Sequence, residues 1–226
     1  MIQRTICVAT VAVVLNGCSL IHRTPPEPVN TPDLPLASDS VADSLLVDLK
    51  IVDTSLVVEV RYATKNNFTG SILPGYEGNR AYLRGEPAAA LALVNADLHL
   101  QGLGLKIFDA YRPVRATEAM VAWTEQAHRP DLLRDGYIAS KSRHNLGVAV
   151  DLTLVDIRSR AELPMGTPFD YFAPLAFTRN AHGVIAKNRQ LLKKVMERQG
   201  FSNYEHEWWH YYYPVENPVR FDRVVR

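Results

Sequence analysis

The sequence predicts a single α+β domain, in which helices pack against a central antiparallel or mixed sheet. Two observations lead to this class: helical and strand-like segments follow one another without a regular βαβ cadence, and no internal repeat is visible. With 226 residues, of which 47% are hydrophobic and 22% charged, the chain can bury one core or at most two small ones. These proportions exclude a disordered tail protein and a polytopic membrane protein.

The first half of the folded chain is expected to hold two strands, a loop and a helix. Apolar and charged residues alternate over 56–62, which is typical of a half-buried strand. Residues 66–80 are rich in Gly, Asn and Pro and predict a loop. Leucine and valine recur at helical spacing after residue 86, which predicts a helix that stops at Gly102. A short strand is expected at 105–108.

The second half is expected to hold two more helices and two more strands. One helix begins near Pro113 and another covers roughly 184–199, ending at Gly200. Residues 148–154 and 208–213 are rich in β-branched and aromatic side chains, which favours strands. The strands therefore supply the sheet and the helices supply its cover.

The N-terminus is expected to direct export rather than to fold. Arg4 precedes an apolar run over residues 6–15, which is too short to span about 30 Å of hydrocarbon comfortably and is typical of an export signal. A small residue before Cys18 makes the segment look like a bacterial lipoprotein signal, in which Cys18 is lipidated. An ordinary secretory signal is the alternative.

Five of the chain's 14 prolines lie in residues 19–40, which favours an extended, semi-rigid spacer. The predicted organisation is therefore a signal peptide at 1–17, a lipidated cysteine with a spacer at 18–40, and a folded domain at 41–226. Such a protein is exported to the periplasm or cell envelope and anchored by lipid to a bacterial membrane.

Charge and cysteine content exclude several kinds of chemistry. Lys and Arg number 25 against 24 Asp and Glu, so no global basic field attracts nucleic acid. If Cys7 leaves with the signal and Cys18 carries lipid, no free thiol remains. A disulfide, a cysteine nucleophile and thiolate metal ligation are then all excluded. Nothing in the sequence indicates an oligomeric state.

The first candidate site residues surround a glycine. Asp151 stands inside the apolar segment 148–154, where a carboxylate is costly unless it is paired or binds a metal. His144 lies seven residues earlier, so a straight strand would direct the two side chains to opposite faces. Gly147 permits a turn that places His144 on a loop and Asp151 in the strand that follows.

The second candidate cluster is the segment 205–213, in which Glu207 and His210 stand among aromatic residues. On one strand these two side chains would point to opposite faces. Glu207 therefore joins the site of His210 only from the start of the strand or from the turn before it. The alternative is an aromatic core strand in which His210 is merely a hydrogen-bonded core histidine.

Together the clusters offer two imidazole nitrogens and one carboxylate oxygen, as in a catalytic zinc site with an open fourth position. Such a zinc ion lowers the pKa of its bound water to about 7. Glu207 is placed to accept the proton of that water and to pass it to a leaving amine.

Arg112 is the third candidate, because it stands between a predicted strand end and a helix that starts with Pro113. A guanidinium there would face the oxyanion that develops on an attacked carbonyl. The alternative is a surface arginine at a helix start, where the helix dipole slightly disfavours a cation.

These motifs, in this order, resemble those of the D-alanyl-D-alanine dipeptidases, a family of zinc peptidases related more distantly to D-alanyl-D-alanine carboxypeptidases and the hedgehog signalling domain. The resemblance covers most of residues 45–213. Its anchors are Tyr62-Ala63-Thr64, Asn67-Phe68-Thr69-Gly70, Gly75-Tyr76-Glu77, Asp109-Ala110-Tyr111-Arg112-Pro113, Ser140-Lys141-Ser142-Arg143-His144, Gly147, Asp151-Leu152-Thr153-Leu154, Pro164-Met165-Gly166, Phe169-Asp170 and Glu207-Trp208-Trp209-His210.

The resemblance implies a role for each site residue. Zinc is expected on His144, Asp151 and His210, with Glu207 as general base and Arg112 as stabiliser of the transition state. It further implies that Asp170 meets the ammonium of the substrate, and that Ser142 and Tyr62 lie near its carboxylate. The alternatives without a role in binding are that Asp170 is a solvated acid in a loop, Ser142 a serine in a turn and Tyr62 a core tyrosine.

The implied activity is hydrolysis of D-alanyl-D-alanine, in an exported protein that meets dipeptides released by cell-wall turnover. A site that pairs both charged ends of a dipeptide measures its length, because a longer peptide leaves a buried charge unpaired. A D,D- or L,D-carboxypeptidase that trims peptidoglycan stem peptides is the alternative if Asp170 lies outside the pocket. A non-catalytic, peptidoglycan-binding lipoprotein with structural zinc is the other alternative, and it has no use for Glu207.

Overall fold

The computed structural model describes residues 30–226. The predicted signal peptide, the predicted lipidation site Cys18 and the first part of the spacer lie outside these residues. Residues 30–38, from the end of the predicted spacer, run along the folded part, where Thr31 N donates to Lys141 O (2.8 Å) and Ala37 N donates to Arg220 O (2.9 Å). Within the described range, no helix combines the length and apolar character needed to cross a membrane.

A five-stranded mixed sheet in the order β2-β4-β5-β7-β6 forms the centre of the molecule. The long strands β4 (Leu103–Asp109) and β5 (Ala149–Asp156) pair antiparallel. On one side β7 (His210–Tyr212) and β6 (Ser202–Asn203) continue the antiparallel pairing, and on the other β2 (Val57–Val58) runs parallel to β4. The mixed sheet and its helices confirm the predicted α+β class.

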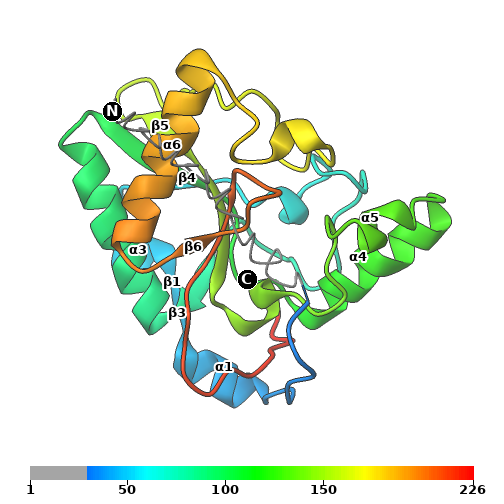
Figure 1. The fold of residues 1–226 in the computed structure, drawn as a ribbon. Coiled ribbons are helices and arrows are strands. Elements are labelled where there is room, and N and C mark those ends of the chain that lie inside the picture. Colours follow the sequence, from blue (N-terminus) through cyan, green and yellow to red (C-terminus); the bar gives the residue numbers. More distant parts are fainter. Residues whose placement is uncertain (1–29) are drawn as a thin grey trace, which may run out of the picture.

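Helices lie on two sides of this sheet (Figure 1). The helices α3 (Gly85–His99) and α6 (Gly183–Arg198) contact each other and pack on β4 and β5. The helices α4 (Val114–Gln126) and α5 (Asp131–Arg134) stand together at the right of Figure 1, away from α3 and α6. The buried side chains of α3 include the predicted apolar stripe, which is Leu91, Val94 and Leu98.

The sequence did not predict several short elements. They are the helices α1 (Asp39–Leu45) and α2 (Leu49–Val52), the antiparallel pair β1 (Leu46–Asp48) and β3 (Tyr82–Arg84), and the short elements α5 and β6. Three 3₁₀ turns also occur in the described chain, at Arg61–Ala63, Arg143–Leu146 and Pro174–Ala176. Each is too short to carry a periodic signal, so only the tertiary structure defines them.

Two predicted strands are shorter than expected. In the segment 56–62 only β2 pairs with β4, and the amide of Asn79 covers the outer edge of the segment, where it accepts from Val60 N (2.8 Å) and donates to Val58 O (3.0 Å). The strand ends because the chain bends after Val60, where Ala63 N donates to Val60 O (3.3 Å). Tyr62 consequently lies in a 3₁₀ turn. In the segment 208–213 the strand begins at His210, since a hydrogen bond from His210 N to Glu207 O (3.2 Å) closes a turn before it.

Gly147 ends the 3₁₀ turn of His144 in a left-handed conformation, with φ of 67°. A Cβ at this position would lie 2.5 Å from Leu46 Cδ2. Replacing Gly147 by Ala is therefore expected to lower the free energy of unfolding by about 2–4 kcal/mol, from backbone strain and overpacking together. Chemical denaturation measures this loss.

The matched control is Gly102→Ala, because Gly102 has a similar φ of 72° but no atom within 4 Å of the added Cβ. That variant introduces backbone strain alone, which is expected to lower the free energy of unfolding by about 1 kcal/mol. Equal losses in the two variants would show that the contact with Leu46 costs nothing.

Candidate metal centre and active site

Two neighbouring strands and the turn before them bring the predicted metal ligands together. Asp151 on β5 stands directly opposite His210 on β7, so their side chains share one face of the sheet. His210 Nδ1 lies 2.9 Å from Asp151 Oδ1, and His144 Nε2 lies 3.1 Å from His210 Nδ1. One donor atom of each residue lies within 4.8 Å of the other two. Gly147 makes the turn that the sequence required.

Hydrogen bonding defines the protonation of His144, which is 2% exposed. Its Nδ1 lies 2.6 Å from the carbonyl oxygen of Ala110, which only accepts, so Nδ1 carries the proton. The lone pair of Nε2 then faces His210 and Asp151. A ligand imidazole in metal sites is oriented in the same way by a partner on its other nitrogen.

The acidic side chains of the site favour the binding of a cation. Four carboxylates, those of Asp109, Asp151, Asp170 and Glu207, lie near the guanidinium of Arg112. Burial raises the pKa of Asp170 and of Glu207 well above their ordinary values, and the nearby Asp151 carboxylate adds to each rise. A divalent ion would compensate this excess of negative charge.

The donor set matches zinc, which takes imidazole nitrogen and carboxylate oxygen and in catalytic sites has three protein ligands. Burial lowers the pKa of His210, which favours the neutral ring that a metal binds. His144, Asp151 and His210 therefore form a zinc site. The alternative in which His210 is merely a hydrogen-bonded core histidine is wrong.

Glu207 lies in the turn that precedes β7, as the parity argument requires. Its N–H donates to Tyr204 O (2.9 Å), and its carbonyl oxygen accepts from His210 N (3.2 Å) and from Asn203 Nδ2 (3.1 Å). The side chain is part of the wall of the pocket that holds the metal ligands, and the residue is 8% exposed. The turn thus directs Glu207 and His210 to one site although they stand three residues apart.

Arg112 is buried beside the metal ligands, so the alternative of a surface arginine is wrong. It is 8% exposed, and its Nε and Nη2 each lie 2.9 Å from Asp109 Oδ2. Its Nη2 lies 3.7 Å from Asp151 Oδ2, and its Cζ lies 4.9 Å from the centre of the Tyr62 ring. Asp109 is fully buried and also accepts from Tyr76 OH at 2.6 Å. The guanidinium is held on several sides.

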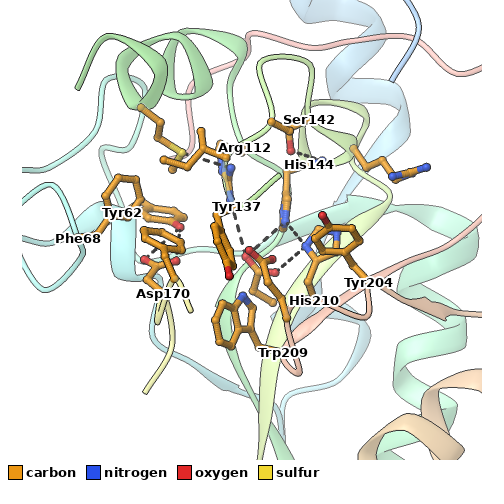
Figure 2. Close-up of a pocket in the computed structure, with 17 residues that line it drawn as sticks. Tyr62, Phe68, Arg112, Tyr137, Ser142, His144, Asp170, Tyr204, Trp209 and His210 are labelled. Carbon is orange, nitrogen blue, oxygen red and sulfur yellow. Dashed lines mark hydrogen bonds and ion pairs between the residues drawn. The ribbon is translucent and has the colours of Figure 1, made fainter. Parts of the chain in front are cut away.

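Asp170 adopts φ of 59°, a left-handed conformation that Asp tolerates better than most residues. Tyr62 OH donates to Asp170 Oδ1 at 3.0 Å. Ser142 lies beyond His144, and its Oγ accepts from His144 N at 3.2 Å. Figure 2 shows Tyr62 and Asp170 together on one side of the pocket and Ser142 on the other. The phenol of Tyr62 thus pairs with Asp170, and the place of Tyr62 and Ser142 near a substrate carboxylate stays a prediction.

Comparison with known proteins agrees with this geometry. The Peptidase M15 family, described as D-ala-D-ala dipeptidase, matches residues 43–223. The chain belongs to this family.

Two curated relatives illustrate the membership. A D-alanyl-D-alanine dipeptidase of Enterococcus faecalis is 37% identical over 171 residues, which is 68% of this chain and 83% of the relative. A D-alanyl-D-alanine dipeptidase of Escherichia coli is 35% identical over 171 residues, covering 75% of this chain and 84% of the relative. The chain is thus a zinc metallopeptidase of the M15 family.

Among solved structures, that of the vancomycin resistance D,D-dipeptidase VanXYg in complex with a D-Ala-D-Ala phosphinate analog is similar to part of the chain. The aligned part covers 75% of this chain and 66% of the VanXYg chain at 15% identity, with a TM-score of 0.40.

One pocket of this M15 peptidase collects every site residue predicted from the described sequence. These are Tyr62, Arg112, Ser142, His144, Asp151, Asp170, Glu207 and His210. Cys18 lies outside the described residues. Sequence reasoning missed the aromatic walls of the pocket, which are Phe68, Tyr137, Phe172, Tyr204 and Trp209. Tyr204 directly precedes the second cluster and Trp209 stands inside it, so both could have been found, whereas Tyr137 and Phe172 lie in loops without a distinguishing pattern.

Proposed function

We propose that this M15 peptidase hydrolyses D-alanyl-D-alanine to two D-alanines in the cell envelope. The observation that carries the proposal is the position of Asp170, which lines the same pocket as the zinc ligands and Glu207. An acidic group at that place complements the free ammonium of a dipeptide. A carboxypeptidase acting on stem peptides has no such ammonium to bind, so the alternative activity is disfavoured.

Glu207 performs the proton transfers. When bound, the zinc ion supplies a Lewis acid that polarises the scissile carbonyl and lowers the pKa of a coordinated water. Glu207 accepts a proton from the attacking water as the water oxygen bonds to the carbonyl carbon. It then gives the proton to the nitrogen of the leaving D-alanine as the C–N bond breaks. Burial raises the pKa of Glu207, which brings the carboxylate closer in basicity to what such a shuttle needs.

Arg112 stabilises the oxyanion that develops on the attacked carbonyl. Asp109 binds two nitrogen atoms of the guanidinium and fixes its position. The guanidinium therefore moves little as negative charge develops on the carbonyl oxygen. Burial opposes the charge on Arg112, but Asp109, Tyr62, Tyr76 and Asp151 together outweigh it and raise the pKa of the guanidinium. A permanently charged donor therefore faces the reacting carbonyl.

Asp170 and Ser142 define the length of the substrate. Asp170, oriented by Tyr62, pairs with the ammonium, and Ser142, which lies beside His144 and apart from Asp170, is assigned to the substrate carboxylate. A longer peptide carries an amide where the ammonium would be and leaves Asp170 buried without a counter-charge. The proposed site therefore prefers dipeptides.

The activity is tested with the purified full chain on D-alanyl-D-alanine, L-alanyl-L-alanine and a pentapeptide ending in D-alanyl-D-alanine. Cleavage of the first alone is expected. An Asp170→Asn variant keeps the shape and the tolerance for left-handed backbone but loses the charge. Its kcat/KM on D-alanyl-D-alanine is expected to fall about 30–1000-fold, which corresponds to about 2–4 kcal/mol.

The matched control is Asp135→Asn, which removes an exposed carboxylate paired only with Arg134 and is expected to change kcat/KM less than about 2-fold. Faster cleavage of the pentapeptide than of the dipeptide would replace the proposal by the carboxypeptidase alternative. Unchanged kcat/KM in the Asp170→Asn variant would remove this residue from the site.

The location in the cell envelope is part of the proposal and is supported by the sequence of residues 1–18. Expressed in a bacterium, the full chain is expected in the membrane fraction and is released by detergent, because a lipid on Cys18 anchors it. A Cys18→Ser variant is expected to leave the membrane fraction, whereas Cys7→Ser is expected to stay. Membrane retention of the Cys18→Ser variant would contradict the lipid anchor.

A further inference from the structure

We propose that Asn145 is a positioning residue of this peptidase, which fixes the turn of the zinc ligand His144 against the segment that carries Arg112. The residue is 2% exposed and lies outside the wall of the pocket. It therefore acts through its neighbours rather than by touching substrate. Its kinetic consequence rests on the proposed hydrolysis, but its consequence for zinc binding does not.

The side-chain amide of Asn145 uses both of its polar atoms. Nδ2 donates to the carbonyl oxygen of Arg112 and to Thr117 Oγ1, each at 2.9 Å. Oδ1 accepts from Ser142 N at 3.2 Å, which closes the turn at its start. One planar group thus joins three places: the start of the ligand turn, the backbone of Arg112 and the helix α4.

The backbone strengthens the same junction. Arg112 N donates to the carbonyl oxygen of His144 at 3.1 Å, so both peptide groups of Arg112 are bonded to the ligand turn. Phe221 N donates to the carbonyl oxygen of Asn145 at 2.8 Å and fixes the turn from the C-terminal side. The relative position of His144 and Arg112 therefore depends on Asn145, on the backbone hydrogen bond from Arg112 N and on the bond from His144 Nδ1 to the carbonyl oxygen of Ala110.

The bonding pattern requires an amide of this length. A carboxylate has no N–H for the carbonyl of Arg112, and a hydroxyl or methyl group is too short to span the gap. Loss of the amide would leave the Arg112 carbonyl and Ser142 N–H without partners in a buried place. The expected result is a shift of the guanidinium and of the imidazole relative to each other, and displacements of about 1 Å cost catalysis heavily.

The test compares Asn145→Ala and the milder Asn145→Ser with Thr117→Val. The Thr117 variant removes the bond from Asn145 to α4 but leaves those to Arg112 and Ser142, so it is the matched control for a loss of stability. Zinc affinity is measured by competition with a chromophoric chelator, the free energy of unfolding by denaturation of the metal-free protein, and kcat and KM on D-alanyl-D-alanine at a temperature where each variant is folded.

Both Asn145 variants are expected to bind zinc about 10-fold more weakly and to lose about 10–100-fold in kcat, with KM changed less than about 3-fold. Thr117→Val is expected to lose stability while zinc affinity and kcat stay within about 2-fold of the unchanged chain. The proposal is overturned if the Asn145 variants lose stability alone, or if Thr117→Val loses zinc affinity in parallel with them. If the unchanged chain does not cleave the dipeptide, the proposed activity fails, and zinc affinity still decides the role of Asn145.

Discussion

Replacing Glu207 by Gln is expected to lower kcat on D-alanyl-D-alanine by about 10²–10⁴-fold while the protein keeps its zinc. Glutamine has the size of glutamate but neither accepts a proton from water nor delivers one to the leaving amine. The metal ligands His144, Asp151 and His210 are untouched by the change. Steady-state kinetics and metal analysis of the same preparation measure both quantities.

Glu205→Gln is the matched control, because Glu205 lies two residues away in the same turn and is partly exposed, with its carboxylate accepting from Arg179 N (3.0 Å). Its kcat is expected to stay within about 3-fold of the unchanged chain. Full activity of Glu207→Gln would show that another group moves the proton. Loss of zinc from Glu207→Gln would instead assign the carboxylate to the metal site.

Removal of the metal by a chelator is expected to abolish hydrolysis, and added zinc is expected to restore it. The same treatment is expected to lower Tm by about 5–15 °C, because the bound ion stabilises only the folded state. Without the ion, the carboxylate of Asp151 repels the charged forms of Asp170 and Glu207, whose pKa values burial already raises. Calorimetry of the metal-free and zinc-loaded protein measures the shift.

Chelator that has been saturated with zinc is the control for direct effects of the reagent. A further control is Gly102→Ala, whose Tm is expected to fall by the same amount on metal removal as that of the unchanged chain, because Gly102 lies outside the pocket. Undiminished hydrolysis by protein from which metal analysis finds no ion would end the metallopeptidase assignment.

The long periodic segments and the motifs were predictable from the sequence. The helix α3 follows its leucine and valine spacing, and β5 follows its run of β-branched residues around Asp151. The odd separation of Asp151 from His144 already required a turn at Gly147, and the parity of Glu207 and His210 required another. Both turns occur, and each is closed by a hydrogen bond between residues three positions apart.

The short elements were not predictable, and neither were the contacts between distant segments. The strand expected over 56–62 ends early because the chain bends into a 3₁₀ turn after Val60, and the amide of Asn79, from a loop, covers its outer edge. The pairing of Tyr62 with Asp170 joins residues 108 positions apart. No local pattern states which loops meet, because that depends on strand order and register.

The amino-acid sequence by itself indicated the class of fold, the zinc ligands and a carboxylate and a guanidinium beside them. The class of fold follows from residue type and spacing, which express local chemistry, whereas the set of site residues follows from these patterns together with the resemblance to the dipeptidase family. The tertiary structure alone decided that Tyr62 serves Asp170, that Asp109 holds Arg112 and that Asn145 joins the two halves of the site. Such contacts depend on side chains that come together only when five strands and their connecting loops are in register, and their energies are set by burial that no short segment achieves alone.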